Sequence, residues 1–225
     1  MKKNIISAIL EIGIGFFAIF WIFLFLEPAI LQGAQNTFTI AQTVSKEISF
    51  TTPGSNVTLS PSLGGLTGGT ATGETQIVVT TNSSLGYMMT IMASSSVGMI
   101  GNASSSNSIP AYVTATAGVP DFSFTVPANK AYFGYSVEAS TTADLATSFK
   151  DAASACDSAG GSDTADKCWI AATSTAYTVV NRTWQTPASG ATTTLKFRVT
   201  INANPSPVIP DDTYVATTTL TATAN

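Results

Sequence analysis

The chain has 225 residues, of which 10% are charged and 44% are hydrophobic, and its formal net charge is −4. Soluble proteins carry about 25% charged residues, so the polarity of this chain comes largely from serine and threonine hydroxyls. The balance of 9 Lys and Arg against 13 Asp and Glu excludes the basic surface of a nucleic-acid-binding protein. The sequence contains no histidine, which removes the commonest general base and the usual zinc ligand sets. We therefore predict a protein that is not an enzyme.

Residues 1–34 predict a membrane anchor or signal segment. Lys2 and Lys3 precede an apolar run that includes Trp21 and is interrupted only by a serine and Glu11. About 20 apolar residues suffice to cross a bilayer as a helix. The lysines at its start predict a cytoplasmic N-terminus, so the rest of the chain is expected to lie outside the cytoplasm.

Two other interpretations of this segment stay open. A cleaved secretory signal would end near Ala34, although Gln32 stands where a small residue is preferred. Type IV pilins carry a glutamate near the start of such a helix, and cleavage before Ser7 would make Glu11 the fifth residue. The residue before that site is Ile6, whereas the pilin peptidase prefers a small one. Glu11 would otherwise lie near the cytoplasmic interface.

Residues 35–225 follow a period of two rather than 3.6, which is typical of half-buried strands. The expected strands are Phe38–Val44, Lys46–Phe50, Asn56–Leu59, Glu74–Thr81, Gly86–Ala93, Phe122–Thr125, Ala131–Glu138, 195–202 and 214–222. Short strands separated by Gly, Pro and Asn predict an all-β, immunoglobulin-like antiparallel β-sandwich. We expect a single exported domain, with an exposed serine-rich loop at Ala93–Ser108 and one short helix at Thr142–Lys150.

Cys156 and Cys168 enclose a glycine-rich acidic loop. In an exported protein two cysteines twelve residues apart are most simply a disulfide, which would contribute about 3 kcal/mol by closing the loop. The loop also contains Asp157, Asp163 and Asp166, whose carboxylates could bind Ca²⁺. Their spacing matches no EF-hand or repeat-type calcium loop, so a solvated acidic loop is the alternative, and no other cofactor is predicted.

The clearest strand begins at Leu195. Its apolar residues are Leu195, Phe197, Val199 and Ile201. We expect these side chains to be buried, and Lys196 and Arg198, on the other face, to be exposed. Trp169, directly after the second cysteine, is expected to pack the cysteine loop onto the sandwich.

Three segments, Gln42–Phe50, Leu85–Ile91 and Pro210–Ala222, carry a family resemblance together with the pattern from Cys156 to Trp169. They resemble the membrane-anchored or secreted β-sandwich surface proteins of uncultivated, small-genome bacteria of the candidate phyla. The resemblance implies an exported β-sandwich more than an activity. The last strand is also similar to that of cell-wall-binding sandwiches with a Trp-x-Leu motif, although the tryptophan is absent here.

The sequence thus leads to two functional hypotheses. The first is a non-enzymatic protein anchored in the cell envelope, with its β-sandwich outside the cell in a structural or adhesive role. The second is a subunit of an extracellular filament or pilus, assembled through the N-terminal helix or through donated strands. The expected partners are the membrane, neighbouring copies and a cell-wall or surface polymer.

Overall fold

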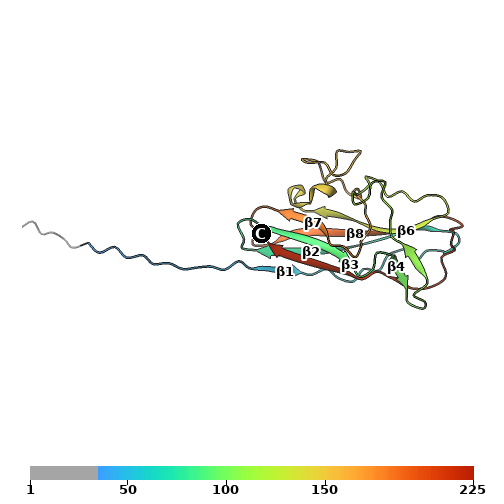
Figure 1. Cartoon of the computed structure of the whole chain (residues 1–225), viewed down its shortest axis with the longest axis horizontal. Coiled ribbons are helices and arrows are strands. Elements are labelled where there is room, and N and C mark those ends of the chain that lie inside the picture. Colours follow the sequence, from blue (N-terminus) through green and yellow to red (C-terminus); the bar gives the residue numbers. More distant parts are fainter. Residues whose placement is uncertain (1–34) are drawn as a thin grey trace, which may run out of the picture. The chain divides into compact units, whose positions relative to one another are not determined.

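The computed structural model describes residues 35–225 (Figure 1). The chain divides into two units, Met1–Thr43 and Val44–Asn225. Every strand found in the described residues belongs to the second unit.

The expected N-terminal helix lies outside the described residues. The same holds for its membrane-related residues Lys2, Lys3, Glu11 and Trp21, and for the two other interpretations of the segment. Within the part of the chain that the structure describes, no helix is long and apolar enough to span a membrane.

One sheet has four antiparallel strands in the order β1-β2-β8-β6. These strands are β1 (Ile48–Thr52), β2 (Gly69–Thr81), β6 (Ala131–Ala139) and β8 (Ala191–Ile201). The predicted burial of Leu195, Phe197, Val199 and Ile201 is confirmed. On the outer face, neighbouring strands are joined by hydroxyl pairs, Ser49 with Thr80 at 3.0 Å and Thr70 with Thr200 at 2.9 Å between oxygens.

The second sheet has three antiparallel strands in the order β10-β3-β7. They are β3 (Tyr87–Ala93), β7 (Tyr177–Arg182) and β10 (Thr218–Ala224). The inward residues of β3 and β7 share one buried cluster with those of β2, β6 and β8. The two sheets therefore pack face to face, and the predicted all-β, sandwich-like architecture is confirmed (Figure 1).

A small third sheet has the order β5-β4-β9. Its strands are β4 (Gly98–Gly101), β5 (Ser108–Pro110) and β9 (Tyr214–Val215). It corrects the expected loop at Ala93–Ser108, because the serine-rich segment forms a hairpin. The turn of that hairpin is ordered by Asp212, whose carboxylate accepts hydrogen bonds from the backbone N–H groups of Ala103 and Ser104.

The helix expected at Thr142–Lys150 is wrong in kind. The structure has two single 3₁₀ turns, η1 (Thr142–Asp144) and η2 (Thr147–Phe149). Between them the chain is extended, and the N–H of Ala146 donates to the carbonyl of Val179 in β7. Tertiary hydrogen bonding has therefore replaced the local hydrogen bonds of a helix, while the apolar side chains of the segment are still buried.

Several expected strands are also absent or altered. The segments Phe38–Val44, Asn56–Leu59 and Phe122–Thr125 form no strand, and β7 was not predicted. The expected last strand is divided into β9 and β10. The three segments that form no strand share a cause, because a segment with a suitable alternation becomes a strand only where a partner edge lies beside it.

Candidate functional site

The cysteine loop closes one side of the sandwich. Cys156 and Cys168 form a disulfide, with their α-carbons 5.6 Å apart, which confirms the predicted pairing. Directly after it, Ile170 exchanges backbone hydrogen bonds with Tyr135 of β6. On the edge of the other sheet, Leu145 forms a β-bridge with Val180 of β7. We call this side, between β6 and β7 and covered by residues 141–172, the closed seam.

A glycine allows the covering segment to approach β6. A β-carbon on Gly134 would lie 2.9 Å from the ring of Phe124 and 3.0 Å from the carbonyl oxygen of Ile170. Those distances are shorter than ordinary van der Waals contact, so only glycine leaves the required space. Trp169 is 1% exposed and lies edge-on to Phe124, with ring centroids 5.3 Å apart. The prediction that Trp169 packs the loop onto the sandwich is confirmed.

The cysteine loop is organised by Asp151, which precedes it. Its carboxylate accepts hydrogen bonds from the backbone N–H groups of Ala153 and Thr164, both at 2.9 Å, and from the hydroxyls of Ser162 and Thr164. Burial alone would raise the pKa of Asp151, but these hydrogen bonds outweigh it and hold the pKa below its ordinary value. The loop is therefore ordered by a carboxylate as well as by the disulfide.

The three calcium candidates make separate contacts. Asp163 accepts a hydrogen bond from the backbone N–H of Ala139 at 3.0 Å, and burial raises its pKa to about 6. Asp166 lies 3.4 Å from the ammonium group of Lys196, and Asp157 has a left-handed backbone with φ of 61°. Within residues 35–225 no group of three or more Asp, Glu, Cys or His side chains could hold a metal ion.

The expected exposure of Lys196 and Arg198 is wrong. The ammonium group of Lys196 lies 2.7 Å from the carboxylate of Glu138, and its side chain is only 19% exposed. The guanidinium of Arg198 lies 4.3 Å from the ring centre of Trp169, a cation–π distance. The segment around the cysteine loop covers this part of the outer sheet face, and the alternation along one strand could not reveal that cover.

A buried ion pair joins η1 to β7. Arg182 donates to the carboxylate of Asp144, and both side chains are at most 6% exposed. The same guanidinium donates to the backbone carbonyls of Trp184 and Gln185, both at 2.9 Å. Burial raises the pKa of Asp144, and the charge of Arg182 opposes that rise. Nothing in the sequence marks this pair, whose partners are 38 residues apart.

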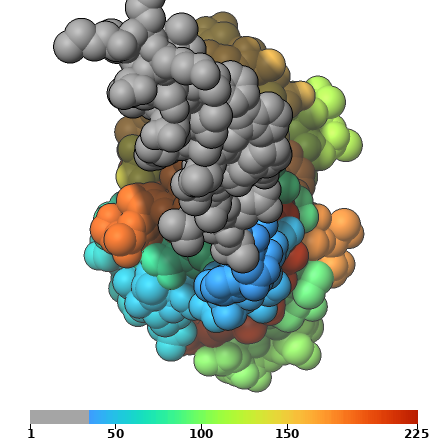
Figure 2. Space-filling view, turned by 90° about the vertical axis from the view of Figure 1, so that its left-hand side faces the viewer, coloured from blue at the N-terminus to red at the C-terminus, as the bar shows by residue number. Residues whose placement is uncertain are grey.

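The opposite side of the sandwich, between β1 and β10, is open, and we call it the open seam. A groove of about 530 Å³ reaches the core there; residues 53–57, which follow β1, line it together with Phe133, Leu195 and Phe197. A second hollow of about 1050 Å³ continues along residues 57–67 and 208–215. Figure 2 views the end of the molecule at which the start of β1, in blue, lies beside the red C-terminal strand.

Comparison with known proteins identifies no family for this chain. No protein-family model matches it, and no curated protein is significantly similar to it.

Proposed function

We propose that the chain is a non-enzymatic cell-surface protein, anchored in the envelope by its N-terminal segment, with a structural or adhesive role. The observation that carries the proposal is the use of charged groups in the sandwich. The groups that would supply chemistry in an enzyme, Asp151, Asp163, Lys196 and Arg182, are each occupied in fixing a loop or a strand end. The disulfide supports a location outside the reducing cytoplasm.

The proposal also includes an immunoglobulin-like type of sandwich and surface partners. Two antiparallel sheets of four and three strands support the first point. The partners we propose are the membrane, through the N-terminal segment, and neighbouring copies or a surface polymer, through the exported domain.

Location is tested with single added cysteines in the full chain, expressed in bacteria that export it. Thr116 lies in an exposed loop of the domain, and Ser7 lies in the N-terminal segment. On intact cells a membrane-impermeant maleimide should label Thr116→Cys and should label Ser7→Cys only after lysis. The wild-type chain is the blank, because its two cysteines are bonded to each other. Labelling of Thr116→Cys only after lysis would contradict the proposal.

The open seam favours a second candidate, a subunit of an extracellular filament. Sedimentation of sheared cell-surface material would separate the two candidates. A filament subunit would pellet as polymer with the sheared fraction, whereas an isolated anchored protein would stay with the membranes.

A further inference from the structure

The two sheets of the sandwich have four outer edges, and three of them are blocked. The edge of β6 is covered by bridges from Ala111 and Ile170, and the edge of β7 by a bridge from Leu145. The edge strand β1 is short and has an irregular register between Phe50 and Thr52. Bridging segments and bulges are the devices that keep sheet edges from pairing with other chains.

In the described residues the remaining edge, β10, has no bridging segment and no bulge, and Lys46 contacts the chain just after its end, at Asn225. Its only strand partner in the described residues is β3, so the opposite row of backbone N–H and C=O groups is unpaired. Residues 218–225 contain no charge and no proline, and they pair with β3 in an unbroken register. A regular, uncharged edge of this kind is a template for an added strand.

The core beside β10 is also incompletely covered. The inward side chains of β3 are at most 3% exposed, whereas Leu220 and Ala222 of β10 are only half-buried. The groove of about 530 Å³ between β1 and β10 extends this gap down to Phe197. A strand that could cover this gap would carry apolar side chains on one face.

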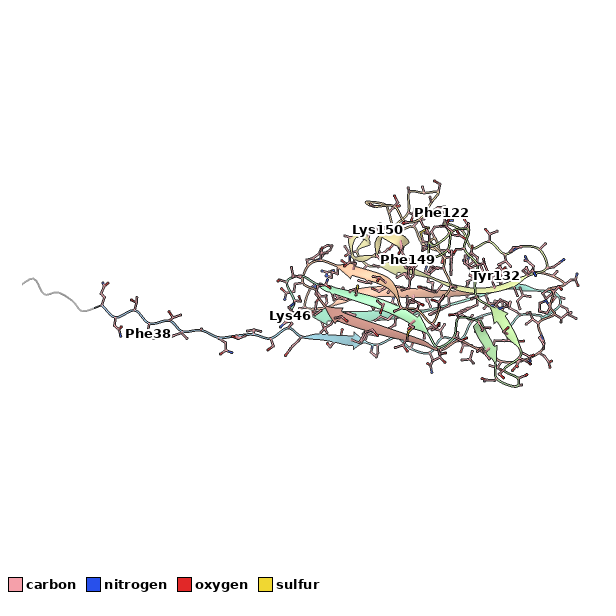
Figure 3. All side chains as sticks on the ribbon, viewed as in Figure 1. Phe38, Lys46, Phe122, Tyr132, Phe149 and Lys150 are labelled. Carbon is pink, nitrogen blue, oxygen red and sulfur yellow. A yellow bond between two sulfur atoms is a disulfide. The ribbon has the colours of Figure 1, made fainter. Side chains whose placement is uncertain are left out.

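The chain itself contains a segment of that kind. Residues 36–45 form no strand or helix, and Phe38, one of them, is labelled in Figure 3. Phe38, Ile40 and Val44 are 77%, 85% and 79% exposed. These three side chains share one face of an extended strand with Asn36 and Gln42, and the other face carries three threonines, an alanine and a serine. The segment has no charged residue, and its apolar and threonine faces match those of β10.

We propose that residues 36–45 of one copy add as a strand to β10 in the open seam of a second copy of this chain. The inward face of the donated strand, led by Phe38 and Ile40, covers the groove, and its threonines continue the outer face of the sheet. Repetition of this head-to-tail contact generates an open polymer rather than a closed dimer. The inference deepens the proposed surface role by naming the partner, and it rests on that role.

The start of the domain favours donation to another copy over return to the chain's own groove. The carbonyl of Ser45 accepts from the side-chain amide of Asn82, whose oxygen accepts from the N–H of Glu47 at 2.7 Å. Lys46 donates to the carbonyl oxygen of Asn225 at 2.8 Å. These three residues form no turn and include no glycine or proline, so the chain does not reverse its direction at them.

The decisive experiment compares two double variants of the full chain, solubilised in a mild detergent, by sedimentation velocity. Phe38→Asp with Ile40→Asp places two carboxylates on the inward face of the donated strand. Thr37→Asp with Thr39→Asp places the same charge on its outward face. We expect wild-type oligomers to be weakened about tenfold or more by the first pair, because burying unpaired carboxylates is costly, and by less than about twofold by the second.

A monomeric wild-type chain would overturn the inference, and so would oligomers that survive the inward pair. Neither result affects the surface location, which the maleimide labelling measures separately. The proposal about assembly and the proposal about location can therefore be refuted separately.

Cross-linking identifies the acceptor strand. Full chains with Thr39→Cys and full chains with Thr221→Cys, in the outward face of β10, are mixed and oxidised, and mixed dimers are expected on a non-reducing gel. Thr116→Cys, in an exposed loop, replaces Thr221→Cys as the matched control and should give none. Equal dimer yields with the two acceptors would overturn the assignment to β10. So would a chain carrying both Thr39→Cys and Thr221→Cys that cross-links only within itself.

Discussion

The two seams of the sandwich differ in how completely the chain covers the edges of the sheets and the core between them. At the closed seam, residues 141–172 cross from β6 to β7, pair with both edges and are bonded covalently by Cys156 and Cys168. At the open seam, β1 and β10 face a groove that reaches the core. The same sheets therefore have one side completed within the chain and one side left incomplete.

The difference shows that the exposure of inward-facing apolar side chains depends on the seam at which they lie. Apolar residues of the closed seam such as Leu145, Phe149 and Ile170 are at most 6% exposed. Leu220 and Ala222, which face the same core from the open seam, stay half-buried. This contrast is the reason why we propose the open side as a binding surface.

The largest expected effect compares truncation at the two seams. Phe149→Ala should lower the free energy of unfolding by about 3–5 kcal/mol, because it leaves a cavity under a rigid cover. Leu220→Ala should cost only about 1–2 kcal/mol in the monomer, because part of its surface already contacts water. Chemical denaturation of the full chain measures both. Equal losses would remove the contrast between the seams.

Opening the disulfide is expected to have the next largest effect. Replacing both Cys156 and Cys168 by serine should cost about 3 kcal/mol, since the closed loop no longer restricts the unfolded chain. Hydrogen exchange should speed up in residues 151–167 while β2 and β8 stay protected. Reduction of the wild-type chain is the control and should give the same pattern. Global loss of protection would mean that the closed seam is required for the whole fold.

Added volume should be tolerated at one seam only. Ala172→Val, at a residue 4% exposed in the core cluster, should cost about 1–3 kcal/mol by overpacking. Ala216→Val, at a half-buried residue that lines the groove of the open seam, should change the free energy of unfolding by less than about 0.5 kcal/mol, because the added methyl groups enter unfilled space. Thermal unfolding of the two variants side by side is the measurement. A larger loss for Ala216→Val would show that the open seam is already filled.

The smallest effect concerns Asp163, next to the closed seam. Its pKa is raised to about 6 in the folded chain, chiefly by burial, while the N–H of Ala139 and the charge of Lys196 oppose the rise and Glu138 and Asp151 add to it. The folded state thus holds this proton more tightly than the unfolded state, so stability should fall as the pH rises from about 4 to about 6.

Because Asp163 is partly exposed, solvent screening keeps this loss below about 1 kcal/mol. Asp163→Asn retains an acceptor for Ala139 and should remove the slope between these pH values. The pH dependence of stability that arises from Asp151 has the opposite sign. Its pKa is lowered in the folded chain, so its stabilising contribution is lost as the pH falls. A variant that keeps the wild-type slope would assign the effect to another carboxylate.

Sequence alternation predicted the strands that pair along their whole length. The side chains of β8 and β3 alternate without a break, because one face of each strand packs on the core while the other faces outward. The missed strand β7 has two consecutive buried residues, Val179 and Val180, where its register with β3 shifts. A bulge destroys the period of two, so no local pattern could have identified this strand.

The candidate site was predictable only in part. The disulfide could be predicted from two cysteines in a chain expected to be exported, whereas the role of Asp151 depends on backbone N–H groups that converge only after the loop folds. The alternation in Phe38–Val44 was read as a strand of the same sandwich, but the structure gives it no partner there. Local sequence encodes the tendency to extend and cannot say which edge receives the strand.

The hydroxyl pairs on the outer face of the four-stranded sheet have an environmental consequence. Oxygen–oxygen contacts such as Thr70 with Thr200 and Ser49 with Thr80 join strands at positions where many proteins place ion pairs. Dissolved salt weakens the attraction between exposed charges, most strongly beyond a screening length of about 10 Å, but it has little effect on bonds between neutral hydroxyls. Strand contacts of this kind hold equally well in dilute and in saline water, as the proposed location outside the cell would require.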